Sequence, residues 1–345
     1  MPISRSRKKK KRKSIKDNHV SKKQRAIAEA LGKNDDRGFL PVRVLCPNLV
    51  ELIFNITPDF RSLYEFEFSN GLQDRIIYSK NRTPIRHIAM FRTIVNESIL
   101  DKSQKQEIVL FENFNQYLWN LCYSLLVLFD KGIHEPRLAG IYKETFVDTP
   151  IVKQAWKVFK AGLSLRNSYD RNLFFSLPNP EINEKQEYIL KSNSIYLAAL
   201  NFIFLHEFGH QSYGHHRNNP SNDESKYDEH LVDEFAIDLM SDHFNSINGP
   251  TLKIGILMGA LSLFFLDKGL NDGEYHPDKD IRLRVIIERL ELEELSNLWG
   301  IASLALNLWM NEFQHNIIVP KSADTAKELF YKTLDSLSNF KKSKK

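Results

Sequence analysis

The spacing of apolar residues changes along the chain and separates a predicted strand region from a predicted helical one. Residues 39–70 alternate short apolar runs with prolines, a pattern typical of strands and turns. From about residue 85 the apolar positions recur at helical spacing, which predicts helices over residues 108–130 and 151–165. A short extended segment is expected at residues 187–191.

The stronger helical pattern lies in the carboxyl-terminal half. A strongly apolar helix is predicted from residue 194 to about residue 213. Further helices are expected over residues 229–245, 252–266, 279–298 and 323–340. The predicted fold class is therefore α+β, mostly helical, with a small N-terminal β region.

Composition divides the chain into four parts. A basic arm that we expect to be disordered occupies residues 1–35, and a basic tail occupies residues 341–345. Residues 36–190 form the N-terminal α+β part of one domain, and residues 191–340 form its core. No Gly/Ser-rich or Pro-rich linker follows residue 35, so the two middle parts are expected to fold together.

The overall composition is that of an ordinary globular protein. Hydrophobic residues make up 42% of the 345 residues and charged residues 26%, which excludes collagen-like, fibrous and wholly disordered chains. The two cysteines, Cys46 and Cys122, can form no disulfide framework, which favours a reducing compartment. The longest apolar stretches, residues 118–129 and 254–266, are shorter than the ~20 residues of a spanning helix. We therefore expect a cytoplasmic protein with no membrane partner.

The net charge of +5 is unevenly distributed. Residues 1–25 carry twelve Lys and Arg against one acid, Asp17, and residues 341–345 add four lysines, which leaves a net charge of −10 on residues 26–340. The body is therefore acidic. The arm is expected to be solvated and to make at most nonspecific contact with nucleic acid or another polyanion through residues 1–25.

Seven of the eleven histidines fall between His206 and His276, and they include the clearest motif in the chain. Residues 206–210 read His-Glu-Phe-Gly-His, an HExxH motif. On a helix, His206 and His210 point to nearly the same side and can bind one metal ion. Glu207 can then hold a water molecule at the metal and take its proton, which makes it the candidate catalytic base.

A catalytic zinc site needs a third protein ligand. Glu229, which follows His210 by nineteen residues, is the first candidate. Asp233 lies one helical turn after Glu229, where it can accept a hydrogen bond from a ligand histidine. Val232 and Ala236 are small enough to let this second helix approach the first.

Two alternative third ligands remain open. Glu234 is followed by an aspartate at the same spacing, but its neighbours are bulkier than Val232 and Ala236. His216 lies six residues after the second histidine of HExxH, where a third histidine ligand stands in HExxHxxGxxH sites. Those sites need glycine at the position that Tyr213 occupies, and here the glycine is Gly214.

These motifs resemble those of the gluzincin metallopeptidases, which carry HExxH on one helix and a Glu-xx-small-Asp-xx-Ala pattern on the next. Within that group, the segments LHEFGHQSYGHH and YHPDKDIRL are most similar to the phage-exclusion (Lit-type) peptidases. The resemblance covers about residues 195–290. It implies a zincin-like fold and one Zn²⁺ per chain, held by His206, His210 and Glu229. Val232 departs from the alanine found in many gluzincins.

A third similar segment lies at residues 274–284. Several gluzincins have a His-Pro pair followed by an arginine downstream of the zinc helices, and here these are His276, Pro277 and Arg282. The resemblance implies that His276 stabilises the negative charge of the reacting carbonyl oxygen and that Arg282 supports the ligands from outside. Alternatively, His276 and Pro277 simply begin the next helix.

The function that these features imply is that of a zinc metalloendopeptidase. A Lit-type resemblance further implies phage exclusion, in which the translation elongation factor Tu is cut once a phage-derived activator peptide is present. Two alternatives are kept. One is a regulatory metallopeptidase of the ImmA/IrrE type, and the other is a non-enzymatic zinc-containing protein that binds RNA or ribosomes through its basic arm.

Overall fold

A computed structural model describes residues 39–58, 65–66, 75–79, 85, 89–95, 104–141, 146–181, 186–215, 221–270, 276–319 and 323–343. Helices dominate these residues, as the sequence predicts. The predicted disordered arm, residues 1–35, lies outside the described residues, and so do His216 and the last two lysines.

The strands form one four-stranded sheet with the order β1-β2-β4-β3. Strand β4 (Gln104–Phe111) pairs in parallel with β2 (Arg75–Ser79) and antiparallel with β3 (Ala89–Val95), and β1 (Glu65–Phe66) extends the sheet beside β2. This is the small N-terminal β region that was expected, but most of it lies after residue 70.

The prediction of strands over residues 39–70 is wrong for most of the described residues in that range. The chain forms a 3₁₀-helix, η1 (Pro41–Leu45), followed by helix α2 (Cys46–Ile56). Each begins with a proline in its first turn, where the missing N–H is not needed. Leu49 and Ile53, four residues apart, are both buried, so the apolar runs follow the helical period.

Helix α4 (Glu112–Phe129) follows β4 without a loop and is buried along nearly its whole length. The helix predicted over residues 108–130 therefore begins four residues too early, because Ile108 to Phe111 belong to the strand. The apolar run is continuous across this junction, so its spacing gives no boundary. The segments that follow are the π-helix η2 (Asp130–His134), α5 (Glu135–Leu138), α6 (Pro150–Ser164) and α7 (Arg171–Phe175). Of these, α6 confirms the helix predicted over residues 151–165.

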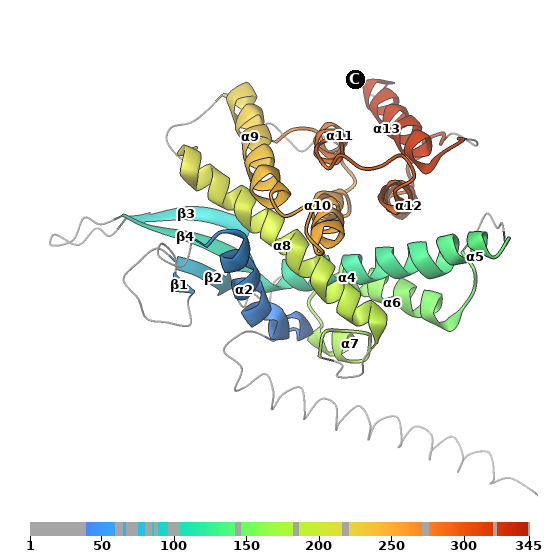
Figure 1. Ribbon diagram of the computed structural model, residues 1–345, viewed down its shortest axis with the longest axis horizontal. Helices are drawn as coiled ribbons and strands as arrows, with labels where there is room; N and C mark the ends of the chain where they lie inside the picture. Colours follow the sequence, from blue (N-terminus) through green and yellow to red (C-terminus); the bar gives the residue numbers. More distant parts are fainter. Residues whose placement is uncertain are drawn as a thin grey trace, which may run out of the picture.

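Helix α8 (Glu187–Tyr213) runs through the centre of the molecule, between the sheet and the carboxyl-terminal helices (Figure 1). It confirms the predicted helix over residues 194–213. The extended segment expected at residues 187–191 is wrong, because these residues form its first turns. By length and composition α8 could cross a membrane, but 72% of its most apolar window is buried by the rest of the protein, as in a core helix.

The carboxyl-terminal helices are α9 (Asn222–Ser241), α10 (Gly249–Phe264), α11 (Lys279–Arg289), α12 (Asn297–Glu312) and α13 (Ala326–Ser343). The single helix predicted over residues 279–298 is wrong in its second half. The chain leaves α11 through Glu291, which has a left-handed backbone with φ 47, and α12 then begins after the capping residue Ser296. Helix α12 is not among the helices that the apolar spacing predicts.

Helices α4, α9 and α10 pack around α8 and hold it in place. On α4, the Trp119 indole donates a hydrogen bond to Asn193 of α8 at 2.8 Å, and the Tyr117 hydroxyl donates one to the Ser262 carbonyl of α10 at 2.5 Å. Helices α8 and α10 approach so closely that a Cβ on Gly255 would lie 2.4 Å from the Ala198 Cβ. The core thereby fixes the helix that carries the HExxH motif.

This close approach generates a prediction for stability. Gly255→Ala should destabilise the protein by about 1–3 kcal/mol relative to Gly259→Ala, because its Cβ would also meet the backbone of α8. Gly259→Ala is the matched control on the same helix, with the same gain in helix propensity and only the ring of Phe202 as its nearest contact, at 3.0 Å. Urea unfolding followed by circular dichroism measures the difference. Equal stability of the two variants would contradict the described packing.

Candidate metal centre

The HExxH motif occupies the last two turns of α8, and its histidines point to the same side of that helix. His206 is buried and His210 is partly buried, and their Nε2 atoms lie 3.3 Å apart. This is the arrangement that a separation of four residues on a helix requires. The two imidazoles therefore present adjacent nitrogen atoms to one point beyond the helix.

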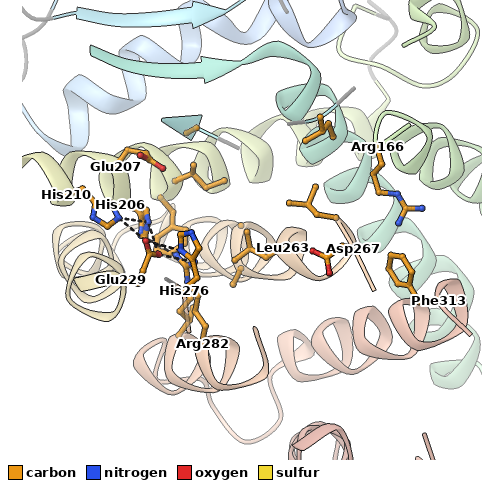
Figure 2. Close-up of a pocket in the computed structure, with 18 of the residues that line it drawn as sticks. Arg166, His206, Glu207, His210, Glu229, Leu263, Asp267, His276, Arg282 and Phe313 are labelled. Atoms are coloured by element: carbon orange, nitrogen blue, oxygen red, sulfur yellow. Dashed lines mark hydrogen bonds and ion pairs between the residues drawn. The ribbon is translucent and has the colours of Figure 1, made fainter. Parts of the chain in front are cut away.

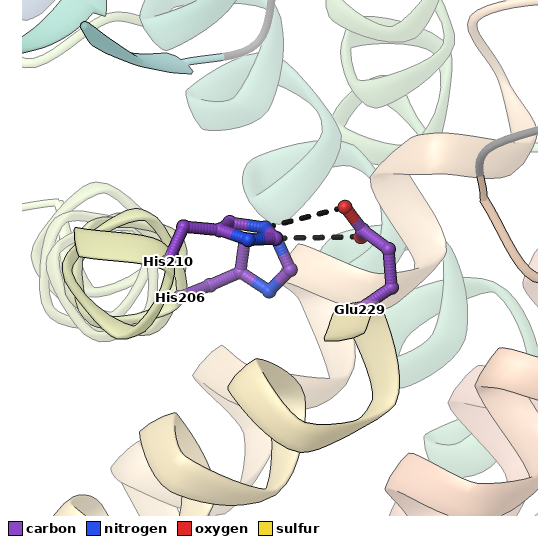
Figure 3. A group of neighbouring side chains, drawn as sticks. All are labelled: His206, His210 and Glu229. Atoms are coloured by element: carbon purple, nitrogen blue, oxygen red, sulfur yellow. Dashed lines mark hydrogen bonds and ion pairs between the residues drawn. The ribbon is translucent and has the colours of Figure 1, made fainter. Parts of the chain in front are cut away.

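Helix α9 brings Glu229 to that point. A capping box between Ser221 and Glu224 fixes where α9 begins. Gly209 allows α9 to come close, because a Cβ there would lie 2.9 Å from Val232. Figure 3 shows the two imidazoles of α8 facing the Glu229 carboxylate.

The distances confirm that the three predicted ligands form one group. Glu229 Oε1 lies 3.2 Å from His210 Nε2, and Glu229 Oε2 lies 3.5 Å from His206 Nε2. One candidate ligand atom from each of the three residues lies within 4.8 Å of the others. The structure thus brings together the three residues that the sequence analysis named first.

Asp233 and Arg282, the two residues expected to support the ligands, both contact this group. Asp233 Oδ1 lies 2.9 Å from His206 Nδ1, and the Arg282 guanidinium donates two hydrogen bonds to the same carboxylate, at 2.6 and 2.7 Å. Arg282 Nη1 also lies 3.4 Å from Glu229 Oε2. Arg282, on α11, therefore links the third helix of the site to both carboxylates of α9.

His210 has a second support that the sequence analysis missed. Its Nδ1 lies 3.2 Å from His215 Nδ1, and His215 Nε2 lies 3.3 Å from Asp228 Oδ1. The left-handed Gly214, with φ 70, ends α8 and turns the chain so that His215 folds back onto His210. The signal in the sequence is Gly214, four residues after His210, because glycine favours the left-handed conformation that ends a helix.

Burial and opposite charges shape the protonation of the group. Burial alone would lower the pKa of His206, but the carboxylates of Glu229 and Asp233 outweigh it and raise the pKa above its usual value. Burial would raise the pKa of Glu229, yet the surrounding imidazoles and Arg282 hold it well below its usual value. The lowered pKa keeps Glu229 ionised, the form that binds a cation, whereas the raised pKa of His206 favours an Nε2 proton that a bound cation would replace.

The hydrogen-bond partners assign a tautomer to each histidine and thereby test whether a metal fits. If His206 Nδ1–H donates to Asp233, and His210 Nδ1–H donates to a His215 whose pKa is lowered by burial, both Nε2 atoms carry lone pairs. These lone pairs then face the Glu229 carboxylate, whose buried Oε2 accepts no hydrogen bond from the described residues. In these tautomers, His206 Nε2, His210 Nε2 and the Glu229 carboxylate are all unprotonated electron-pair donors, and such a set fits a cation such as Zn²⁺.

A cavity of about 720 Å³ opens beside the group. Figure 2 shows the candidate ligands at one end, Leu263 in the middle, and Arg166, Asp267 and Phe313 at the other end. Glu207 lines the cavity next to the ligands, which is where a general base must stand. The middle of the cavity is apolar, so it can take substrate side chains as well as water.

His276 also lines this cavity and is half exposed. Its Nδ1 lies 3.1 Å from Glu229 Oε1, so it contacts a candidate ligand directly. Helix α11 begins at Lys279, three residues after His276. The alternative interpretation, in which His276 and Pro277 only begin that helix, leaves this contact unexplained.

The rival ligands occupy different positions. Glu234, on α9, lies 2.8 Å from Arg289 and 3.7 Å from His230, away from the His206–His210–Glu229 group. His216 lies outside the described residues, so its candidacy stays a prediction. His230 does not join the group either, and among the described residues no fourth ligand closes the site.

The geometry ranks the third-ligand candidates. Glu229→Ala should weaken Zn²⁺ binding far more than Glu234→Ala, because Glu229 faces both Nε2 atoms whereas Glu234 contacts His230 and Arg289. Zinc content after dialysis, with a competing chelator, measures the difference. Glu234→Ala serves as the matched control on the same helix, and a larger loss in that control would move the ligand.

The missed support generates a second prediction. His215→Ala should weaken Zn²⁺ binding by about 10- to 100-fold, since residues that orient a ligand histidine have effects of this size. His243→Ala is the control, because His243 lies beyond the end of α9 and outside the metal group. Chelator competition on the folded variants measures both. An unchanged affinity in His215→Ala would show that the His210–His215 contact orients nothing.

Comparison with known proteins agrees with this site. A scan against protein-family models matches peptidase U49 over residues 108–302. Searches of the curated proteins and of the solved structures found no match. The matched region includes HExxH, Glu229, Asp233 and the segment with His276 and Arg282. Because the match covers more than half of the 345 residues, the chain belongs to the peptidase U49 family.

Proposed function

We propose that this peptidase is a zinc-dependent endopeptidase. The observation that carries the proposal is the convergence of His206 Nε2, His210 Nε2 and the Glu229 carboxylate within 4.8 Å beside a large cavity. Two nitrogens and one carboxylate are a donor set that Zn²⁺ prefers, and three protein ligands leave a position for water. When bound, zinc would supply a Lewis acid that polarises the scissile carbonyl and lowers the pKa of water toward ~7.

The residues of the chain divide the remaining work. His206 and His210 are oriented by Asp233 and His215 and present their Nε2 lone pairs, while Glu229 contributes the negative charge. Glu207, next to His206 on α8, takes a proton from the attacking water and passes it to the leaving amine. In this proposal His206, His210 and Glu229 bind the metal, and Glu207 transfers the proton.

His276 acts on the substrate side. It stands in the cavity wall and its Nδ1 lies 3.1 Å from Glu229 Oε1. Because Nδ1 faces the Glu229 carboxylate, Nε2 is the ring atom from which a protonated His276 would donate a hydrogen bond to the carbonyl oxygen of a bound peptide as that oxygen gains negative charge. His276→Ala should therefore lower kcat more than it weakens zinc binding.

The substrate follows from the Lit-type resemblance alone. We propose that the enzyme acts in phage exclusion and cuts the translation elongation factor Tu when a phage-derived peptide is present. Purified elongation factor, incubated with the enzyme and an extract of phage-infected cells, should yield two fragments that an extract of uninfected cells does not produce. An intact elongation factor beside other cleaved proteins would instead favour the regulatory peptidase of the ImmA/IrrE type.

The peptidase proposal is tested at Glu207. Glu207→Gln should retain zinc and thermal stability, because the amide keeps the size of the side chain and Glu207 is not one of the three grouped ligands. Hydrolysis should fall by at least about 10²- to 10⁴-fold, the contribution of a positioned acid–base group. Zinc content, the melting temperature and cleavage of a casein substrate give the three measurements.

The matched control for this test is Glu187→Gln, at the exposed first turn of the same helix. It makes the same chemical change about five turns from the site and should leave hydrolysis unchanged. Full activity in a folded, zinc-loaded Glu207→Gln protein would refute the proposed mechanism.

A further inference from the structure

A second recess lies on the outer side of the metal centre, between α9 and α11. Its volume is about 430 Å³, and most of its wall is apolar. The lining residues are Lys226, Tyr227, His230, Asp233, Pro277, Asp278, Ile281, Arg282 and Val285. Asp233 and Arg282 belong also to the metal centre, so the recess and the centre share a wall.

Apolar surface continues outside the recess. Tyr227 is 61% exposed and Ile281 is 52% exposed, and they stand on the two helices that form its sides. Large apolar side chains at the mouth of a concave site are typical of surfaces that bind another polypeptide. A small molecule would fill the recess and leave these two side chains in water.

The charges of the lining residues indicate the chemistry of the partner. Asp233 is paired with Arg282, and Asp278 is paired with Lys341 at 2.7 Å. Lys226 is partly buried and makes no ion pair with any part of the chain that the structure describes. The charge left for a ligand at this rim is therefore positive, and a carboxylate is its complement.

We propose that this recess is a docking site for a partner polypeptide that presents an apolar side chain next to an acidic residue. The apolar side chain enters between Val285 and Ile281, and the carboxylate pairs with Lys226. The backbone around them covers Tyr227. The site is separate from the cavity in which peptide hydrolysis is proposed, although both contact Arg282.

Occupancy of the recess would also act on the metal centre. Asp233 is already buried, so a bound side chain would remove water from the 11% exposed Arg282 side chain, and the attraction between the two charges would grow as the local dielectric falls. Asp233 Oδ1 lies 2.9 Å from His206 Nδ1, so a docked segment that strengthens the Asp233–Arg282 pair would also restrict the motion of His206, a proposed metal ligand. This coupling rests on the proposed zinc function, whereas the docking itself does not. By reciprocity, zinc would tighten the binding of the partner by the factor by which the partner tightens the binding of zinc.

The test uses the full chain, both zinc-loaded and after chelation, with the probe acetyl-Asp-Phe-amide and the control acetyl-Lys-Phe-amide. Isothermal titration should detect the acidic probe with a Kd of about 1 mM or below, and the basic probe at least about fivefold more weakly. Lys226→Glu and Tyr227→Ala should each weaken the acidic probe, since both side chains line the recess and neither lines the catalytic cavity.

The matched control variant is Lys157→Glu, on the exposed side of α6, which should bind the probe like the wild type. Zinc should tighten the acidic probe by about fivefold, the lower end of common coupling strengths. Equal binding of both probes, equally strong binding of phenylacetate, or an affinity unaffected by Lys226→Glu would overturn the docking site. A protein that binds the probe at Lys226 but takes up no zinc would refute the proposed function and leave the docking site standing.

Discussion

The close contact between α8 and α9 at Gly209 sets the geometry on which the site depends. Val232 lies where a side chain on residue 209 would have to be, so the helices meet at the distance that two histidines and a carboxylate need to share one ion. The capping box at the start of α9 sets which turn faces α8, and α10 supports α8 near Gly255. A bulkier residue at position 209 would move Glu229 away from both imidazoles.

The ligand group could be predicted from the sequence because its rules are local. A separation of four residues places His206 and His210 on one face of any helix, and the buried run before them makes the helix certain. Glu229 and Asp233 follow the same rule on α9. His215 obeys no such rule, because it lies past the end of α8 and returns to the site only through the left-handed turn at Gly214.

The fold was predicted well where helices are long and poorly where elements meet. At the junction of β4 and α4, strand and helix are both buried on all sides, so the apolar run has no period to mark the change at Glu112. Proline suits both a turn and the first turn of a helix, so the prolines at the start of η1 and α2 do not distinguish the two structures. The start of α12 could not be predicted because the break after Arg289 depends on the left-handed backbone of Glu291. Glutamate rarely adopts that conformation, so its presence does not indicate the end of a helix.

The first two turns of α9 have an unusual construction. From Asn222 to Glu229 the buried side chains are only Ser225 and Glu229, so this half of the helix has no apolar anchor in the core. Its attachment depends on the contacts that Glu229 makes with His206, His210 and Arg282, and the proposed cation would strengthen that attachment. If the enzyme binds zinc as proposed, loss of the ion would allow this part of α9 to open locally while the core stays folded. Proteases cut such openings first, so the lifetime of the enzyme would then depend on the supply of zinc.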